Sequence, residues 1–434
     1  MEVGRRRCVH CSSFGRSASV VQRRWQSGSS FLPRDVVIAS AARTPVGSFL
    51  GSLASLTAPQ LGGIAISQAL KRIPLEGDQV DGVIMGQVLP AGCGQAPARQ
   101  AALGARIPER VDAFGVNKVC SSGLKSVALA ANAVALGQAD IMVAGGMESM
   151  SNAPYLLRKA RVGGYKHGHG VLEDNLLQDG LWDVYNDIHM GKCAEKTARD
   201  HSIPRVAQDE YALASYKRAA DAWKTGMMTK EVVPVKIPNP AADKKPGSGV
   251  PPFVSVEEDE EYPKLKLDKV AGLKPVFDPE GTITAANASK LNDGAAALVL
   301  MSADTAERMA VEPLARILSF ADAAVKPIDF SIAPSQSVQK AIKLAGLHKV
   351  DYYEINEAFS CVVLANMQLL GLDHEQVNVH GGAVALGHPI GASGCRILIS
   401  LLNVLGARDA TYGCAAICNG GGGSTAMVVE RIAA

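Results

Sequence analysis

Two cysteines and one histidine stand in runs of very small residues, where the backbone is open to a ligand. Cys120 lies in residues 118–123 (KVCSSG), and Cys418 directly precedes an asparagine and four glycines. Between them along the chain, His388 lies in residues 387–391 (GHPIG). A thiol activated by a histidine can take up an acyl group as a thioester. A second thiol can act as an acid and base toward a carbon acid. The three residues therefore indicate acyl transfer coupled to deprotonation of carbon.

Cys120 has the local setting of a nucleophile. A cysteine among small residues is more often a buried packing residue. Cys120, however, directly precedes an expected helix, whose N-terminal amides and dipole favour the thiolate over the thiol. A cysteine hydrolase is the competing interpretation from another enzyme class. It would need only Cys120 and His388 and would leave Cys418 without a role.

Alternating strands and helices must position these residues. The segment before Cys120 is β-branched, and the helix after it is apolar or tiny nearly all round, which indicates a helix buried in the centre of the protein. In chain order the pattern predicts a strand at 35–40, a helix at 57–70, a strand at 80–88, a helix at 122–136 and a strand at 139–146.

The C-terminal part of the chain repeats this order of elements. The pattern there predicts a strand at 377–379, a glycine turn at 388–394, an apolar helix at 394–405, a strand at 413–417 and a glycine run at 420–423. The repetition predicts two similar α/β halves packed face to face. Such packing would bring the two helix N-termini, and with them Cys120 and His388, to one central cleft.

The segment between the halves, residues 151–271, breaks the pattern. We expect a lid-like insertion with one helix at 208–225. Residues 239–252 are rich in proline, glycine and lysine and predict a solvated, mobile loop. The apolar stretch at 359–372 is polar at three positions and is too short to span a bilayer, so it predicts a buried helix.

Composition favours an α/β protein with reduced thiols. The 434 residues suffice for two or three domains. A hydrophobic content of 47% with 43 glycines and few aromatic residues fits an α/β protein better than a β-sandwich. The nine cysteines have no regular spacing and do not predict a disulfide framework.

Charge is concentrated in the first 34 residues. They hold seven arginines and no lysine against the single acidic residue Glu2, a net +6, which leaves −4 for residues 35–434 because the whole chain carries +2. An arginine- and serine-rich segment nearly free of acid predicts a mitochondrial transit peptide, with a disordered basic arm as the alternative. The acidic remainder argues against a nucleic-acid-binding role.

Five motifs together carry a resemblance to a known family. They are residues 117–123 (NKVCSSG), 145–150 (GGMESM), 356–359 (NEAF), 387–391 (GHPIG) and 418–422 (CNGGG). With these motifs in this order, the chain from about residue 35 to 434 resembles the thiolase superfamily, and within it the mitochondrial short-chain branch.

The resemblance implies a fold and a division of the chain. The fold is a duplicated, five-layered α-β-α-β-α architecture with an inserted loop domain. The N-terminal half would comprise residues 35–150 together with 272–311, the C-terminal half residues 312–434, and the coenzyme A-binding insertion residues 151–271. Residues 1–34 would be the transit peptide.

The resemblance also implies a role for each residue of the site. Cys120 would be the nucleophile that accepts an acetyl group, His388 the base that activates it, and Cys418 the acid and base that deprotonates a second acetyl-CoA. One oxyanion hole would use His388 and a water held by Asn356. The other would use the backbone N–H groups of Cys120 and Gly420, where a Cβ would crowd the thioester.

The implied activity is that of an acetyl-CoA C-acetyltransferase. It joins two acetyl-CoA molecules reversibly into acetoacetyl-CoA and CoA, and Phe330 would shape a pocket for cleaving 2-methylacetoacetyl-CoA, as in ketone-body and isoleucine metabolism. The alternative within the family is a longer-chain 3-ketoacyl-CoA thiolase of fatty-acid β-oxidation. A ketoacyl synthase fits less well, since that chemistry uses a histidine where Cys418 stands. The remaining hypothesis is that the protein is an inactive scaffold that binds acyl-CoA.

Further positions follow from the resemblance alone. Coenzyme A would contact His189, Met190, Tyr216, Lys269, Ser289, Ala358 and Phe359, with Lys264 and Lys266 as candidates for its phosphates. An activating potassium ion would bind Tyr216, Ala285, Ala286, Ala288 and Val384. His380 precedes a double glycine near the site, and we interpret it as a hydrogen-bonding support rather than a catalytic group. The family implies a homotetramer in the mitochondrial matrix, with no nucleic-acid or membrane partner.

Overall fold

The computed structural model of the chain describes residues 31–239, 242 and 250–432. The expected transit peptide therefore lies outside the described residues, apart from its last four positions. Most of the loop expected at 239–252 also lies outside them. The seven cysteines of the described part are all free, as their irregular spacing predicts.

A ten-stranded sheet forms the centre of the molecule, in the order β14-β15-β16-β13-β1-β12-β5-β3-β4, with β2 paired to β12. The strands of the N-terminal half are β1 Val36–Arg43, β2 Gly47–Ser48, β3 Gly82–Gly86, β4 Asp112–Val116, β5 Ile141–Ser149 and β12 Asn292–Ser302. Those of the C-terminal half are β13 Ala315–Ala324, β14 Tyr352–Ile355, β15 Tyr412–Asn419 and β16 Gly423–Arg431. Pairing of residues 36–38 in β1 with residues 315–317 in β13 joins the two halves.

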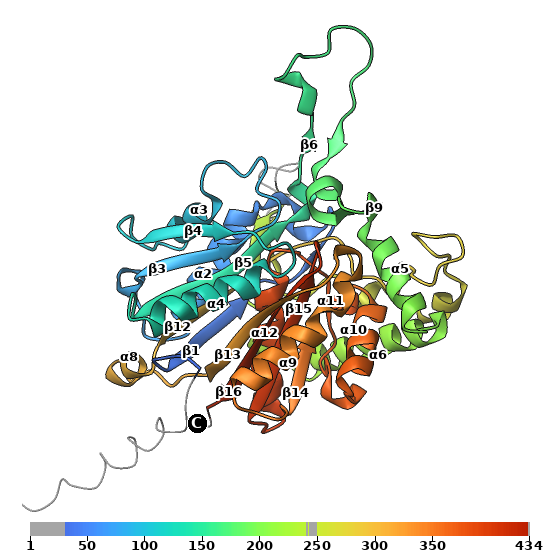
Figure 1. Cartoon of the computed structure of the whole chain (residues 1–434). Helices are drawn as coiled ribbons and strands as arrows, with labels where there is room; N and C mark the ends of the chain where they lie inside the picture. The colour runs from blue at the N-terminus through green and yellow to red at the C-terminus, as the bar shows by residue number, and fades with distance from the viewer. Residues whose placement is uncertain (1–30, 240–241, 243–249, 433–434) are drawn as a thin grey trace, which may run out of the picture.

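The two halves of this sheet lie on opposite sides of a middle layer of helices, and outer helices cover the other face of each half, which makes five layers. The outer helices of the N-terminal half are α2 Ala58–Lys71 and α3 Pro97–Gly104, and those of the C-terminal half are α9 Ala333–Leu344 and α10 Ser360–Leu370. The middle layer consists of α4 Ser122–Ala135 and α12 Ser393–Ala407, which touch each other and strands of both halves (Figure 1). The five-layered α/β fold expected from the sequence is confirmed.

The middle layer explains the unusual composition of its two helices. Most side chains of α4 and α12 are buried, because each helix faces a sheet on two sides. The helices also approach each other closely at glycines. A Cβ on Gly123 would lie 2.9 Å from the Gly391 carbonyl oxygen, and one on Gly394 would lie 2.3 Å from the Leu124 nitrogen. Only glycine permits this spacing, which brings the two helix N-termini together.

The strand expected at 377–379 does not form. Only one bridge, between Tyr353 and Val377, connects this segment to β14. Asn378 has a positive φ of 49°, and its side-chain Oδ1 accepts from the Ile355 N–H at 2.9 Å while its Nδ2 donates to the Ile355 carbonyl at 2.8 Å. The side-chain amide thus makes the hydrogen bonds that a neighbouring strand would make. The strand that does form here, β14, was not expected from the sequence.

The insertion packs into the C-terminal half and is not a separate lid. Its two long helices are α5 Met190–Asp200 and α6 Arg205–Lys224, and they contact α10 and α11 Ala383–Leu386. A hairpin of β6 Tyr155–Leu156 and β7 Glu173–Asp174 projects away from the body (Figure 1). The expected helix at 208–225 is α6, with an earlier start.

The remaining elements are short. They are α8 Ala303–Arg308, the strand pairs β8 Trp182–Asp183 with β9 Ile188–His189 and β10 Val235–Pro238 with β11 Phe253–Val256, the 3₁₀ segments η1 Ser52–Ser55, η2 Gly77–Gln79, η3 Met150–Asn152, η4 Arg158–Ala160, η6 Met228–Lys230, η7 Tyr262–Lys264, η8 Leu267–Gly272, η9 Pro327–Ile332 and η10 His374–Gln376, and the π-helix Leu176–Leu181. Within the described ranges no helix is long and apolar enough to cross a membrane.

Candidate active site

Four of the predicted site residues lie at the ends of central elements. Cys120 and His388 occupy the turns that lead into α4 and α12, whose N-termini meet. Asn356 follows β14, and Cys418 lies near the end of β15. Because β14 and β15 are parallel, with Ile355 opposite Ala416, their carboxyl ends meet at the same edge of the sheet. The topology therefore brings both thiols, the imidazole and the amide to one place.

The turn that carries Cys120 is held in an uncommon backbone conformation. Val119 has a φ of 48°, which is rare for a β-branched residue. Asn117 Oδ1 accepts from the Val119 N–H at 2.9 Å, and Ser122 Oγ donates to the Val119 carbonyl at 2.6 Å. Ser121 Oγ donates to the Ile417 carbonyl at 3.1 Å and so attaches the turn to β15. The hydrogen bonds fix Cys120 beside the strand that carries Cys418.

Loss of solvation keeps both site thiols protonated, although Cys418 is fully buried and Cys120 only half-buried. It raises the pKa of Cys120 to about 12, although the backbone N–H groups of Gly420 and of Cys120 itself act in the opposite direction. Burial also raises the pKa of Cys418 well above its usual value, and the nearby Cys120 adds to this. The thiolate that the helix N-terminus was expected to favour is therefore not the resting form, because loss of solvation outweighs the amides and the dipole.

Neighbouring groups set the tautomer of His388. Its Nδ1 lies 2.6 Å from Ser393 Oγ, and that hydroxyl donates its own proton to the Pro389 carbonyl at 2.9 Å. Ser393 must then accept from an Nδ1–H, which leaves Nε2 as the basic nitrogen. Burial, with a smaller contribution from Arg396, lowers the pKa of His388 to about 3, so the imidazole is neutral at physiological pH.

Sequence reasoning missed three residues that hold this histidine and its loop. They are Ser393, Asn292, whose Oδ1 accepts from the His388 N–H at 2.8 Å, and Glu148. The buried Glu148 carboxylate accepts from the N–H groups of Val88 at 2.9 Å, Leu89 at 3.2 Å and Gly391 at 3.0 Å. Burial raises the pKa of Glu148 to about 7, although the three N–H donors act to lower it. The sequence offered one sign of the role of Glu148, which is a charged residue within the otherwise small and apolar motif at 145–150.

Two groups of donors are placed for oxyanions. The N–H groups of Cys120 and Gly420 both act on the Cys120 thiol, where an acyl oxygen would develop charge. Asn356 Nδ2 lies 3.4 Å from His388 Nε2, and Asn356 Oδ1 is buried without a hydrogen-bond partner in the described part of the chain. This amide oxygen is therefore free to accept a hydrogen bond from a water.

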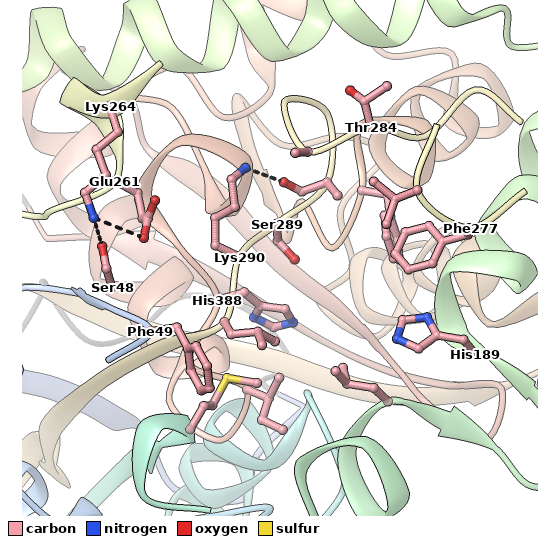
Figure 2. Close-up of a pocket in the computed structure, with 18 residues that line it drawn as sticks. Ser48, Phe49, His189, Glu261, Lys264, Phe277, Thr284, Ser289, Lys290 and His388 are labelled. Atoms are coloured by element: carbon pink, nitrogen blue, oxygen red, sulfur yellow. Dashed lines mark hydrogen bonds and ion pairs between the residues drawn. The ribbon is translucent and has the colours of Figure 1, made fainter. Parts of the chain in front are cut away.

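A cavity of about 550 Å³ leads to His388. Figure 2 shows His189 and Phe277 together on one side of His388, and Lys264 with Ser48 and Glu261 on the other. The His189 ring stacks on Phe277 with centroids 4.7 Å apart, which gives the cavity an aromatic wall. The cavity lining is otherwise largely apolar and includes Thr284, Ala285 and residues 288–291.

The predicted coenzyme A contacts divide into four groups. His189, Ser289, Phe359 and the candidate Lys264 line the cavity. Met190 and Ala358 are buried in the cluster that also contains Cys418 and Phe330 and are not lining residues of the cavity. Tyr216 is buried in another cluster, with Val384. Lys269 and Lys266 are exposed and do not line this cavity.

The residues expected to bind potassium do converge, but an ammonium group lies among them. Lys290 Nζ donates to the Ala288 carbonyl at 2.7 Å, lies 3.5 Å from the Val384 carbonyl, and lies 5.7 Å from the centre of the Tyr216 ring. These carbonyls are the donors that a potassium ion would need, so the site as built does not fit that ion. Sequence reasoning missed Lys290, although it directly follows the expected cation loop.

His380 lies outside this cavity. It is grouped with Arg218, His374 and Arg408 in a separate depression of the surface, and burial lowers its pKa. His380 is therefore not as near the site as we expected, and its role as a hydrogen-bonding support stays a prediction.

Comparisons with known proteins agree with this geometry. Residues 36–304 match the family model for the thiolase N-terminal domain, and residues 311–431 match that for the thiolase C-terminal domain. The chain is 52% identical over 401 residues to a mitochondrial acetyl-CoA acetyltransferase of Rattus norvegicus, covering 92% of this chain and 91% of the relative. It is 51% identical over 399 residues to the cytosolic acetyl-CoA acetyltransferase ERG10 of Gibberella zeae, covering 92% and 98%. Among solved structures, Acat5 thiolase from Ascaris suum in complex with coenzyme A matches with a TM-score of 0.84 and 44% identity, covering 92% of this chain and all of that one.

Proposed function

Since this chain belongs to the thiolase family of acyltransferases, we propose that it is an acetyl-CoA C-acetyltransferase that works through an acetyl-Cys120 intermediate. The main support for this proposal is that two protonated thiols lie beside a neutral imidazole whose basic nitrogen is Nε2. A hydrolase needs one thiol. Carbon–carbon bond formation between two thioesters needs an acyl acceptor and a separate acid and base.

The first half-reaction loads the enzyme. His388 Nε2 takes the proton of Cys120 as the sulfur attacks the carbonyl carbon of acetyl-CoA. The N–H groups of Cys120 and Gly420 stabilise the oxyanion that forms. The CoA thiolate then leaves and takes the proton of Cys418. The products are acetyl-Cys120, free CoA, a protonated His388 and a Cys418 thiolate.

The second half-reaction forms the carbon–carbon bond. The Cys418 thiolate takes a proton from the methyl group of a second acetyl-CoA. The enolate oxygen is stabilised by the Nε2–H of His388 and by a water on Asn356. The enolate carbon attacks acetyl-Cys120, acetoacetyl-CoA forms, and the released Cys120 sulfur regains its proton from His388. All protons are then in their starting positions, consistent with the raised pKa of both thiols.

Replacing Cys418 tests this division of labour. In Cys418→Ala, acetyl-CoA should still acetylate Cys120, as detected by mass spectrometry of the intact protein. Condensation should fall by about 10³-fold or more, since the carbon acid loses its base. Cys361→Ala is a matched control, because it removes another buried thiol of the same cluster.

Two results would contradict the mechanism. Unchanged turnover in Cys418→Ala would show that the second thiol is not used, as in a hydrolase. Failure of the native enzyme to become acetylated at Cys120 would favour the inactive scaffold.

The proposed substrates are short acyl chains, including 2-methylacetoacetyl-CoA. Phe330 is buried in one cluster with Met190, Phe359 and Cys418, and these bulky side chains limit the space beside the thiols. Thiolysis rates with ketoacyl-CoA substrates of increasing length, and with the 2-methyl compound, test this. Faster cleavage of long chains would favour the 3-ketoacyl-CoA thiolase alternative.

The proposed location is the mitochondrial matrix, where ketone-body and isoleucine metabolism would use this reaction. The arginine-rich composition of residues 1–34 supports it. Mitochondrial and cytosolic relatives are about equally similar, so identity does not decide the matter. Import of a fluorescent protein fused to residues 1–34 tests the location, and light scattering of the purified protein tests the homotetramer that the resemblance implies.

A further inference from the structure

Lys290 binds three separate segments beside the substrate cavity. Its ammonium donates to Ala288 in the cavity wall, approaches Val384 in α11, and lies over the ring of Tyr216 in α6. Figure 2 shows the side chain extending from the loop that carries Ser289, away from His388. The group therefore connects the cavity wall to two helices that are distant from it in sequence.

The surroundings of this ammonium are those of a cation site. A lysine ammonium has three donors and no acceptor, and backbone carbonyls and an aromatic face are its matching partners. Glu357 lies behind Val384, since its Oε2 accepts from the Val384 N–H at 3.0 Å. Glu261 contributes a second carboxylate to the lining of the cavity. These two carboxylates favour the charged form of Lys290, against the burial that lowers its pKa to about 8.

The same carbonyls cannot also hold a metal ion. The Ala288 oxygen is 2.7 Å from Nζ, so an ion bound to that oxygen would lie within a few ångströms of a positive charge. Two like charges at such a distance repel strongly when they are partly removed from solvent. We propose that the ammonium of Lys290 is a built-in cation that takes the place of a potassium ion, and that the enzyme is independent of potassium.

The structural role of this cation is to hold the cavity wall. The carbonyl of Ala288 and the side chain of Ser289 belong to the wall on which a CoA thioester would lie, and the Ser289 N–H donates to the Ala358 carbonyl at 3.0 Å. Removing the ammonium would leave converging carbonyls beside two carboxylates. We expect such a site to recruit a monovalent cation from solution.

Thermal unfolding without substrate tests the proposal independently of the proposed function. The native protein should have the same Tm in potassium, sodium and tetramethylammonium chloride at equal ionic strength, the last cation being too large to enter. Lys290→Ala should have a lower Tm in tetramethylammonium chloride, and potassium should restore it selectively. In Lys290→Met, which fills the space with an apolar side chain, the loss should persist in all three salts.

A kinetic measurement and a control complete the test. The KM for CoA in the thiolysis reaction is a second readout, and it rests on the proposed function. In Lys290→Ala this KM should rise several-fold when potassium is absent and return toward the native value when potassium is added. Lys264→Ala removes another cation from the same cavity without touching the Ala288 carbonyl, so its Tm should not respond to potassium.

Three outcomes would overturn the proposal. One is a potassium-specific rise in the Tm of the native protein. Another is a Lys290→Ala variant that keeps the native Tm and KM in every salt. The third applies even if the variants do not fold: an anomalous-scattering peak beside the Ala288 carbonyl in native crystals soaked in rubidium chloride.

Discussion

The reactive residues of this enzyme combine reactivity with burial. Cys120 and Cys418 are surrounded by apolar groups, and this raises the pKa of both thiols. His388 is buried too, and the same loss of solvation lowers the pKa of its imidazole to about 3. The three groups are therefore all neutral before substrate binds. Activation must come from proton transfer during the reaction, because no ion pair is formed in advance.

This protonation state predicts the pH dependence of alkylation. With the pKa of Cys120 raised to about 12, the thiolate fraction should increase about tenfold for each pH unit up to that pKa. The rate of Cys120 alkylation by iodoacetamide in the free enzyme should therefore rise between pH 6 and pH 9 without levelling. Peptide mass spectrometry can follow the modified residue. A plateau below pH 8 would instead indicate a thiolate paired with a charged histidine.

At the same scale, sequence motifs predicted which residues lie together but not how they are supported. Cys120, His388, Cys418 and Asn356 converge as expected. Ser393 and Asn292 act through short hydrogen bonds to His388, and hydroxyl or amide side chains at such positions are too common to single out from one sequence. Lys290 was not expected at the carbonyls predicted for potassium, and its ammonium donates to one of them, that of Ala288; this contact is the basis of our proposal that it takes the place of the ion.

Among the elements, the pair α4 and α12 decides whether the site exists. The two helices start at the same place because glycines remove the side chains at their closest contacts. His388 precedes α12 by a few residues, and Cys120 precedes α4 in the same way. Any change that separates the helix N-termini should therefore move the imidazole away from the thiols.

Two glycines of α12 provide a matched test of this packing. A Cβ on Gly394 would lie 2.3 Å from the Leu124 nitrogen, whereas one on Gly406 would meet nothing within 4 Å. Gly394→Ala should destabilise the protein by about 1–3 kcal/mol through overpacking and lower kcat by at least about tenfold. Gly406→Ala should keep full activity and gain up to about 1 kcal/mol from helix propensity. Tm and thiolysis rates measure both, and equal effects would contradict the packing argument.

Local pattern predicted the buried helices and several strands, but not β12, β13, β14 and β16 of the central sheet. The buried helices lie within a few residues of their expected bounds. A long run of apolar and very small residues predicts a helix that is buried on all sides. The strand expected at 377–379 does not form because Asn378 bonds to β14 through its side chain. Periodicity does not reveal such a replacement, since the β-branched neighbours of Asn378 still favour a strand.

At the scale of the whole molecule, a buried ion-pair network attaches the insertion to both halves. Arg43 at the end of β1 donates to Glu231 Oε1 at 2.6 Å and to the two oxygens of Asp259 at 2.7 and 2.9 Å. Asn403 in α12 also donates to Glu231, at 2.7 Å. Burial alone would lower the pKa of Arg43, but the two carboxylates raise it above its usual value. The network thus links β1, the insertion and the middle layer.

Removing this arginine should destabilise the entire assembly of layers. Arg43→Met would leave two carboxylates buried without their partner, at a cost of about 3–5 kcal/mol. Arg199→Met is the control, because Arg199 is 62% exposed and lies 3.9 Å from Asp278, where an ion pair contributes about 0–1 kcal/mol. Thermal unfolding should show a large fall in Tm for the first variant and almost none for the second. Similar Tm values would show that the network does not hold the insertion.

The sequence by itself determined the reactive groups, the family, the α/β class and the central position of the helices behind Cys120 and His388. These follow from residue type and short-range pattern, which one chain displays directly. The tertiary structure alone decided that the thiols rest protonated, that Nε2 of His388 is the base, that the insertion packs into the C-terminal half, and that Lys290 fills a cation site. Each of these depends on solvation or on contacts between residues far apart in the chain. Proton affinity and ligand choice are set by those contacts, and a local pattern does not specify them.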